Sequence, residues 1–288
     1  MRIVVAYKWA SDPQEAAVGV DGRVDWSRAK PGIGEYDTVA MELARRLAEA
    51  TGGELIGLTA GAKGVGAAIA CKAALSRGLD RAVIVEDDSL KGASSTELAA
   101  VLASAVRHVG DVDLVITGDS SVDVGAKMVP TVLAGQLGWA GVAEVTAVSG
   151  QDGKFRVERA VPGGVQVLEI SGPAVLAAAA DAEVARVPGM KDVLAAGKKP
   201  VEHLEIAALD VPATGAVVTV KGTARPELKA RKAWATSPIH ERFSGGIARY
   251  QGSCSSIRAI AFWARRPEDF SSRRSVAACG WPRTGSGA

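Results

Sequence analysis

Acidic, hydroxyl-bearing and glycine residues are concentrated in one stretch, TGDSSVDVGAKMVPTVLAG (117–135). An apolar run, DLVIT, precedes it, and an apolar helix-like segment follows it. A loop from the carboxyl end of a strand to the start of a helix exposes unpaired backbone N–H groups and the positive end of the helix dipole. Small residues such as Ser120 and Gly125 would let a phosphate or a ribose approach this backbone. Asp119 and Asp123 could instead cap the helix and leave no ligand, so the spacing alone favours neither interpretation.

A second glycine-rich stretch, GAKGVGAA (61–68), also invites comparison with phosphate-binding loops. A P-loop ends in Gly-Lys-Ser/Thr, which places a lysine on the phosphates and a hydroxyl on magnesium, whereas Lys63 lies in mid-loop without that ending. The G-x-G-x-x-G spacing of dinucleotide-binding folds is absent too. We therefore interpret these glycines as turn residues between a strand and a helix.

Cysteine and histidine are too few and too scattered for a disulfide framework, a metal site or a Ser-His-Asp hydrolase. The chain has three of each, at Cys71, Cys254, Cys279, His108, His203 and His240. A metal enzyme and a Ser-His-Asp hydrolase are therefore not expected.

Strand-like and helix-like segments alternate through the first half of the chain. Short β-branched runs predict strands, and apolar residues at helical spacing predict the helices between them. The expected strands cover 2–7, 54–60, 81–87 and 113–118, and the expected helices cover 38–51, 65–78, 94–110 and 126–139. This order predicts an α/β fold, a Rossmann-like parallel sheet with helices on both faces. Ligands of such sheets bind beyond the carboxyl ends of the strands.

From residue 142 onward, helix-like segments no longer alternate with the strand-like ones. Three alternating segments separated by glycine-containing turns predict a small antiparallel β excursion, and 173–183 predicts another core strand. The next stretch, 185–206, is broken by Pro188 and Gly189 and contains a short amphipathic segment. Its exposed-looking apolar residues suggest a partner contact, although a surface helix that packs its own Val193 is an equal alternative.

Composition bounds the class of protein. The chain has 288 residues, 48% of them hydrophobic, and no apolar run reaches the roughly 18–20 residues that span a bilayer. The opening MRIVVAY predicts a strand and not a signal peptide. We therefore expect a soluble, cytoplasmic protein.

The charge is unevenly distributed. From residue 221 onward there are 13 Lys and Arg against 4 Asp and Glu, whereas the preceding residues have 21 against 28. The tail is also rich in Arg, Ser and Trp and has no sustained periodicity. An out-of-frame reading of GC-rich coding DNA is one hypothesis for it, and a tail that binds nucleic acid nonspecifically is another.

Five stretches, in this order, resemble electron transfer flavoprotein β subunits, the FixA-like family. They are VVAYKWASDP, GEYDTVAMELARRL, AALSRGLDRAVIVED, VERAVPGGVQVLEISGPAVLAA and RVPGMKDVLAAGKKPVE. The resemblance implies an adenine-nucleotide-binding domain over 1–210, with a docking loop near 185–200. The remainder, 211–288, stands where the family has a C-terminal arm and matches it poorly.

The resemblance also implies cofactors and partners. A β subunit of this family pairs with an α subunit that holds most of a redox-active FAD, and it binds AMP as a structural element, with FAD in that place in bifurcating relatives. It carries electrons from flavin dehydrogenases, such as acyl-CoA dehydrogenases, to a downstream oxidoreductase and is not itself an enzyme. The implied nucleotide contacts are Ala6, Gly34, Glu35, Tyr36, Asp37, Ala60, Gly118, Asp119, Ser120, Ser121, Val122, Asp123, Val124, Gly125, Ala126, Lys127, Met128 and Val129.

Three further implications concern single residues. Tyr36 matches an aromatic position that approaches the α subunit's flavin. Pro188 and Met190 match the loop that docks acyl-CoA dehydrogenases, with Met190 as its apolar anchor. Gly34 replaces the family's usual asparagine, and Gly125 replaces a polar residue, so the side-chain selection of AMP over ADP or FAD stays open.

Two other classes of protein remain at this point. A stand-alone nucleotide-binding regulatory module of the universal-stress type would share the sheet and the adenine site, but it would not need 142–206. An enzyme of adenylate chemistry would need catalytic acids, lysines or metal ligands at the strand ends, and none stands out.

Overall fold

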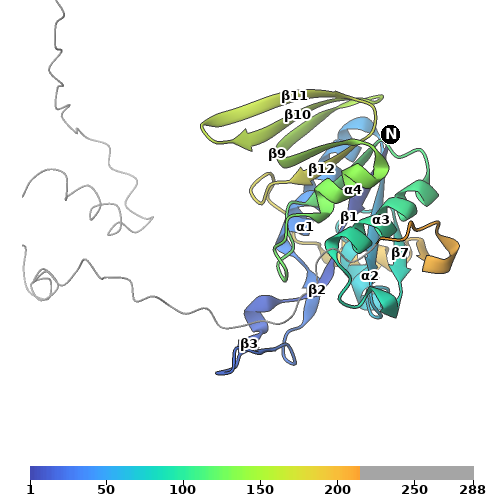
Figure 1. Ribbon diagram of the computed structural model, residues 1–288. Coiled ribbons are helices and arrows are strands. Elements are labelled where there is room, and N and C mark those ends of the chain that lie inside the picture. The colour runs from blue at the N-terminus through green and yellow to red at the C-terminus, as the bar shows by residue number, and fades with distance from the viewer. Residues whose placement is uncertain (215–288) are drawn as a thin grey trace, which may run out of the picture. The chain divides into compact units, whose positions relative to one another are not determined.

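A computed structural model describes residues 1–214 of the chain; the predictions for the tail from residue 215 onward lie outside these residues. A nine-stranded sheet forms the centre of this part, in the order β11-β10-β9-β12-β8-β1-β6-β7-β13 (Figure 1). In this order, the seven strands that begin with β9 and end with β13 are parallel to one another. Strand β10 is antiparallel to both of its neighbours, β9 and β11. The predicted α/β class with a parallel sheet is confirmed.

The nine strands of the sheet are 4 to 12 residues long, and the five at its centre, β12, β8, β1, β6 and β7, are largely buried. Their bounds are β1 (Arg2–Ala6), β6 (Glu54–Gly61), β7 (Arg81–Glu86), β8 (Leu114–Gly118), β9 (Ala140–Gln151), β10 (Lys154–Val161), β11 (Gly164–Ser171), β12 (Ala174–Ala178) and β13 (Val201–Leu204). The expected antiparallel excursion is β9–β11. It extends the main sheet, because β9 pairs with β12 on one side and with β10 on the other.

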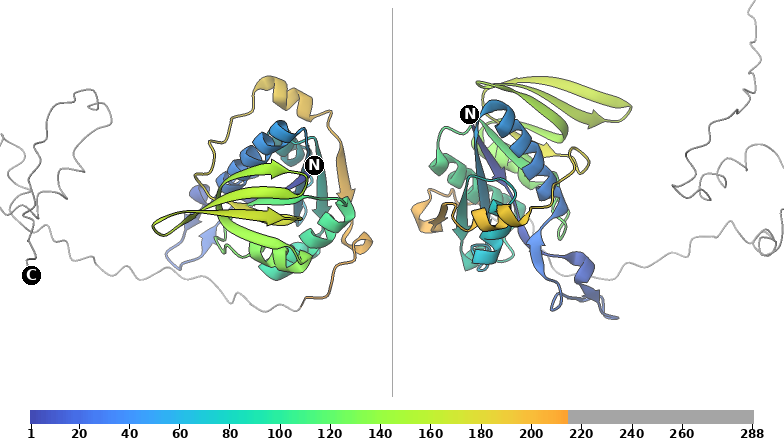
Figure 2. Two further views of the ribbon diagram at one scale, coloured as in Figure 1. Left: turned by 90° about the horizontal axis from the view of Figure 1, so that it is seen from above. Right: turned by 180° about the vertical axis from the view of Figure 1, so that it is seen from behind.

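Helices cover both faces of the sheet, as predicted. Their bounds are α1 (Glu35–Thr51), α2 (Ala68–Leu75), α3 (Ser95–Val109), α4 (Val129–Leu137) and α5 (Met190–Ala196). Alternate residues of β1 separate two cores: Ile3 and Val5 pack with α1 and α2, whereas Val4 and Ala6 pack with α3 and α4. Figure 2 shows these layers from above and from behind.

Two helix starts differ from the sequence prediction. The second helix begins at Ala68 and not at 65, because Ala67 is extended, with φ −61° and ψ 145°, and forms the N-cap. The fourth begins at Val129 and not at 126, because Gly125 and Lys127 have positive φ angles. Pro130 lies in the first turn of α4, as expected, where its missing N–H costs little.

The start of α3 confirms the predicted capping box. Ser94 Oγ accepts from the N–H of Glu97 at 3.3 Å, and the N–H of Ser94 donates to Glu97 Oε2 at 2.8 Å. This pair of bonds fixes where α3 begins, and its first residues line a cleft together with the carboxyl ends of the strands.

Several small elements were not predicted. Strand β13 closes the sheet beside β7, and a two-stranded ribbon joins β2 (Trp9–Ser11) to β5 (Pro31–Ile33). A second ribbon of β3 (Ala17–Val18) and β4 (Val24–Asp25) projects from the body in Figure 1. Among the described residues, no helix is long and apolar enough to cross a membrane.

Candidate functional site

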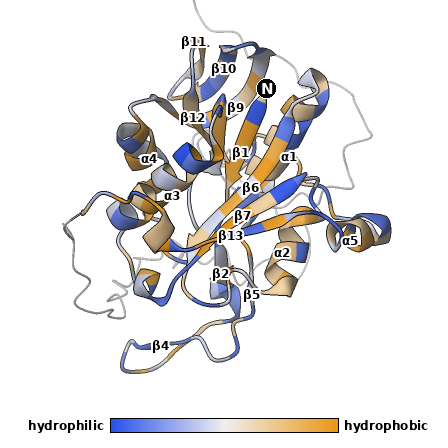
Figure 3. Cartoon of the chain, turned by 90° about the vertical axis from the view of Figure 1, so that its right-hand side faces the viewer, coloured by the Kyte–Doolittle hydropathy of each residue, from blue (hydrophilic) through white to orange (hydrophobic). Residues whose placement is uncertain are grey.

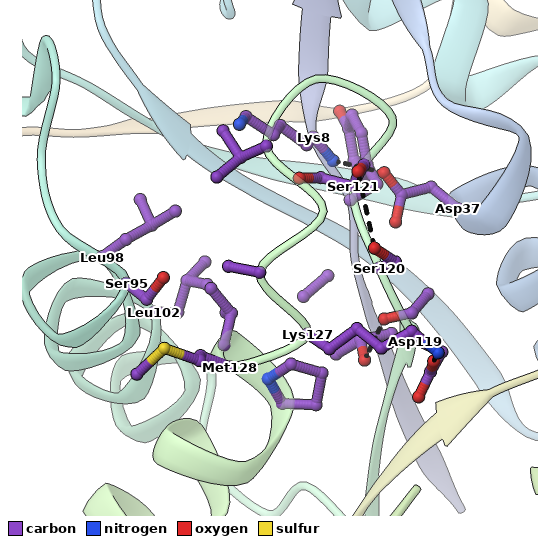
Figure 4. Close-up of a pocket in the computed structure, with 18 of the residues that line it drawn as sticks. Lys8, Asp37, Ser95, Leu98, Leu102, Asp119, Ser120, Ser121, Lys127 and Met128 are labelled. Atoms are coloured by element: carbon purple, nitrogen blue, oxygen red, sulfur yellow. Dashed lines mark hydrogen bonds and ion pairs between the residues drawn. The ribbon is translucent and has the colours of Figure 1, made fainter. Parts of the chain in front are cut away.

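A cleft opens beyond the carboxyl ends of β1, β6 and β8, on the face of the sheet that α3 and α4 cover (Figure 4). This is the position at which parallel α/β sheets bind ligands. Many of the predicted contacts line it: Ala6, Asp37, Ala60, Gly118, Asp119, Ser120, Ser121, Val124, Ala126, Lys127, Met128 and Val129. The structure therefore brings together residues that lie more than 100 positions apart in the sequence.

One wall of the cleft is apolar. Leu98 and Leu102 project from α3, and Met128 and Val129 stand at the start of α4. The short side chain of Ala60 at the end of β6 leaves the space between these helices open. A flat apolar group, such as a nucleobase, fits a wall of this composition.

The opposite wall is the loop between β8 and α4, whose backbone is left largely unpaired. Within residues 1–214, its amides make two backbone hydrogen bonds: from Asp119 to Ala178 O (3.1 Å) and from Gly125 to Ser121 O (3.0 Å). The N–H groups of Ser120 and Ser121 donate to no acceptor in that part of the chain. Helix α4 also begins without a side-chain cap. Free amides beside a helix N-terminus form an environment that suits an anion.

The start of α1 lies directly against the end of β8. The carboxylate of Asp37, in the first turn of α1, is buried and accepts the N–H of Lys8 at 2.9 Å. A Cβ on Gly118 would come within 2.8 Å of Asp37 Oδ1 and 2.9 Å of the Tyr36 carbonyl carbon, so a residue larger than glycine does not fit. Burial raises the pKa of Asp37 to about 7, although the N–H groups of Lys8 and Gly118 act in the opposite direction.

Two lysines tie the loop to the rest of the fold. Lys8 Nζ lies 2.6 Å from Asp123 Oδ2. Burial alone would raise the pKa of Asp123, but the hydrogen bond and charge of Lys8 outweigh it and lower that pKa overall. Lys127 Nζ lies 2.5 Å from Asp119 Oδ2 and 3.0 Å from Glu144 Oε1, and these carboxylates, Asp119 first, raise the pKa of Lys127.

A second hollow lies on the other side of the same loop. It is bounded by the β2–β5 ribbon and by the predicted contacts Gly34, Glu35, Tyr36, Val122 and Gly125; Ser120, Ser121 and Lys127 line both hollows. Asp123 lines neither, since its carboxylate is directed to Lys8. The loop is therefore a wall between two recesses, and the predicted residues divide between them.

Some lining residues were missed from the sequence: Tyr7, Lys8, Ala93, Ser95, Leu98, Leu102, Thr117 and Pro130. Lys8 and Thr117 border strand ends and could have been proposed on that ground. The α3 residues could not have been proposed. A periodic pattern indicates which face of a helix is buried, but it does not indicate which residues of that face line a cleft at the strand ends.

The other glycine-rich loop has no free anion site. Glu86 Oε2 accepts the N–H groups of Gly64 at 3.1 Å and Gly66 at 2.8 Å. The chain's own carboxylate thus occupies the place where a phosphate would bind, which supports the interpretation of these glycines as turn residues.

The family of the chain follows from comparison with known protein families. The family model described as the electron transfer flavoprotein domain matches residues 24–209. The chain belongs to the electron transfer flavoprotein family. Proteins of this family carry electrons rather than catalyse a reaction of their own. The matched span begins in the β3–β4 ribbon and ends after β13, so it includes most of the cleft.

In this electron transfer flavoprotein chain, the segment expected to dock partners is exposed. Met190 begins α5, and 76% of it is accessible. Val187 and Leu194 are exposed as well, at 90% and 66%. Pro188 lies just before α5 and is half-buried. Ala196, at the end of α5, is buried against α2 and anchors the segment.

Proposed function

We propose that this chain is the β subunit of an electron transfer flavoprotein. It forms a heterodimer with an FAD-binding α subunit and carries electrons from flavin dehydrogenases, such as acyl-CoA dehydrogenases, to a downstream oxidoreductase. The observation that carries the proposal is the cleft at the strand ends, which is bounded by a loop with free amides, in a chain whose family match spans most of the cleft.

AMP is the nucleotide that we propose for this cleft. The apolar wall of Leu98, Leu102 and Met128 suits the adenine, and the loop after Gly118 offers unpaired amides to a phosphate. Lys8 and Lys127 are already paired with carboxylates, so little positive charge is left for a longer phosphate chain. These features support a nucleoside monophosphate over FAD.

The FAD shared with the α subunit supplies the redox chemistry of the heterodimer. This chain would shape the surroundings of that flavin. Tyr36 lines the second hollow, which opens away from the nucleotide cleft and is bordered by the β2–β5 ribbon. We propose that this hollow faces the flavin of the α subunit.

Docking of the electron donor is assigned to the segment around α5. Pro188 and Met190 lie there, and the apolar side chains of Val187 and Leu194 are exposed beside them. Exposed apolar side chains grouped on one segment favour a protein contact over a solvated surface.

Co-expression with an electron transfer flavoprotein α subunit from the same genome tests the proposed function. We expect a stable complex of the two chains with the absorbance of an oxidised flavin. A colourless homodimer that binds ATP would contradict the proposal and favour a regulatory module of the universal-stress type.

A further inference from the structure

Three arginines converge on Gly78, just after α2. A Cβ on Gly78 would lie 2.7 Å from Arg45 Cδ and 3.4 Å from Arg186 Nη2, and Arg77 precedes it in the chain. Arg77 Nη1 donates to the main-chain oxygen of Arg186 at 3.3 Å. The Arg77 guanidinium therefore contacts the main chain of Arg186, and the Arg186 guanidinium lies beside Gly78, where the missing side chain leaves it room.

The charges of these arginines are unequally compensated. Arg45 is paired with Glu42 and Glu49 on its own helix. Arg77 forms no ion pair within residues 1–214, and Arg186 has one long contact, 3.7 Å to Asp192. Burial of a guanidinium without a carboxylate is unfavourable, since its donors lose water without gaining an equally strong acceptor.

Two further observations support an incomplete site. Arg186 Nε is buried and has no hydrogen-bond partner among the described residues. Burial, and then the nearby charge of Arg186, lower the pKa of Arg77. Among the described residues, Arg77 thus donates to a main-chain oxygen but to no carboxylate, and the carboxylate nearest to Arg186 is Asp192 at 3.7 Å. A closer carboxylate would offset the burial and the mutual repulsion of the two groups.

The α5 segment beside the two arginines is held to the region of α2 by hydrogen bonds, and it exposes apolar side chains. Lys199 Nζ donates to the carbonyls of Leu75 (3.2 Å) and Leu79 (2.5 Å), which fastens the segment to the end of α2. Figure 3 shows α5 beside α2. Met190 and Leu194 project from this fixed base into solvent.

We propose that Arg77 and Arg186 form a receptor for a carboxylate of the partner protein that docks on the α5 segment. The partner's surface would present an Asp or Glu beside an apolar pocket: the carboxylate binds between the guanidinium groups, while Met190 enters the pocket. An arginine binds a carboxylate through two parallel hydrogen bonds, so the pair fixes the orientation of the docked protein as well as its affinity. The inference rests on the docking role proposed above.

The test is binding of the assembled heterodimer to an acyl-CoA dehydrogenase from the same genome, measured by surface plasmon resonance at several NaCl concentrations. We expect Arg77→Gln and Arg186→Gln each to raise Kd about tenfold and to flatten its dependence on salt. Met190→Ala should raise Kd and leave the salt dependence unchanged. The matched control is Arg46→Gln. Arg46 belongs to α1, which covers the same face of the sheet as α2, and it is already paired with Glu183. The Kd of this variant should stay near the wild-type value.

The outcomes separate this proposal from the docking role itself. If both arginine variants bind as tightly as the wild type while Met190→Ala weakens binding, the carboxylate receptor is wrong and the docking role stands. If the wild-type heterodimer does not bind the dehydrogenase, the docking role fails and the receptor with it. Thermal unfolding of each variant shows whether a raised Kd comes from lost structure, and Arg77→Lys, which keeps the charge but not the paired hydrogen bonds, should restore Kd only in part.

Discussion

Asp37 and Gly118 show how single residues set the geometry of the cleft. The carboxylate of Asp37 is buried where α1 meets the end of β8, and Gly118 leaves it room. The sequence predicted both residues as nucleotide contacts, but it could not predict that they touch each other, because contact between a helix start and a strand end depends on the packing of the whole layer. Their roles in nucleotide binding remain predictions.

Gly118→Ala tests this contact. The added methyl group would meet the backbone of Tyr36 as well as Asp37, so α1 must shift. We expect a loss of about 1–3 kcal/mol in the free energy of unfolding, measured by urea denaturation. The control is Gly135→Ala in α4, where a Cβ meets nothing within 4 Å and helix propensity should add up to about 1 kcal/mol. A Gly118→Ala protein as stable as the wild type would contradict the described packing.

Asp37 also predicts a dependence of stability on pH. Its pKa is raised from 3.8 to about 7 in the folded chain, so the folded state binds more protons than the unfolded state between these values. The contribution of Asp37 to stability is therefore greatest at low pH and falls as pH rises toward 7. Asp37→Asn removes this fall, since the amide cannot ionise and its oxygen can still accept the N–H of Lys8.

We expect Asp37→Asn, freed of nucleotide, to be more stable than the wild type at pH 8 by about 1–4 kcal/mol, and nearly equal to it at pH 4.5. Urea denaturation at a series of pH values measures the difference. A constant difference between the two proteins across this range would show that Asp37 does not titrate there.

Among the elements, the loop between β8 and α4 separates the cleft from the second hollow and lines both. Its shape follows from two left-handed residues, Gly125 and Lys127, and from its ion pairs to Lys8, Asp119 and Glu144. These features delay the start of α4 and leave amides free beside it. The loop was the strongest candidate site in the sequence, and its place at a strand end was predicted correctly.

Gly125→Asp and Gly125→Asn form a matched pair that tests the loop. Both side chains tolerate the φ of +65° at this position, and a Cβ there meets no close neighbour. The two variants should therefore fold with similar stability and differ in charge alone. Gly125 borders the second hollow, but its neighbours Val124 and Ala126 line the cleft, so a charge added at this position acts on the phosphate across the loop. We expect Gly125→Asp to bind AMP severalfold more weakly than Gly125→Asn in isothermal titration. Equal affinities would show that no phosphate approaches this part of the loop.

The positions of helices and strands could be predicted where the pattern of side chains alone determines the secondary structure. The buried strands and α1 follow from apolar runs and helical spacing, and α3 from its Ser94–Glu97 box. The edge strand β13 was missed because VEHL has no apolar run or alternation long enough to indicate a strand; its pairing with β7 defines it. The late starts of α2 and α4 were missed because the backbone angles before them cannot be read from the glycines alone.

At the scale of the molecule, the described part of the chain places distinct features on separate elements. The strand ends form the cleft that we propose for AMP, the β2–β5 ribbon borders the hollow beside Tyr36, and the α5 segment exposes Met190. An arrangement of this kind suits a carrier that must hold a nucleotide and contact two partners. The family match to residues 24–209 covers most of these features, apart from β1 and β2, but does not distinguish the subunits.

We propose above all that the cleft of this chain holds AMP in a heterodimer whose α subunit carries the FAD. The most direct measurement is the nucleotide content of the purified heterodimer, released by denaturation and resolved by chromatography. We expect one AMP and one FAD for each pair of chains. Release of the single FAD alone, from a complex that is folded and yellow, would contradict it.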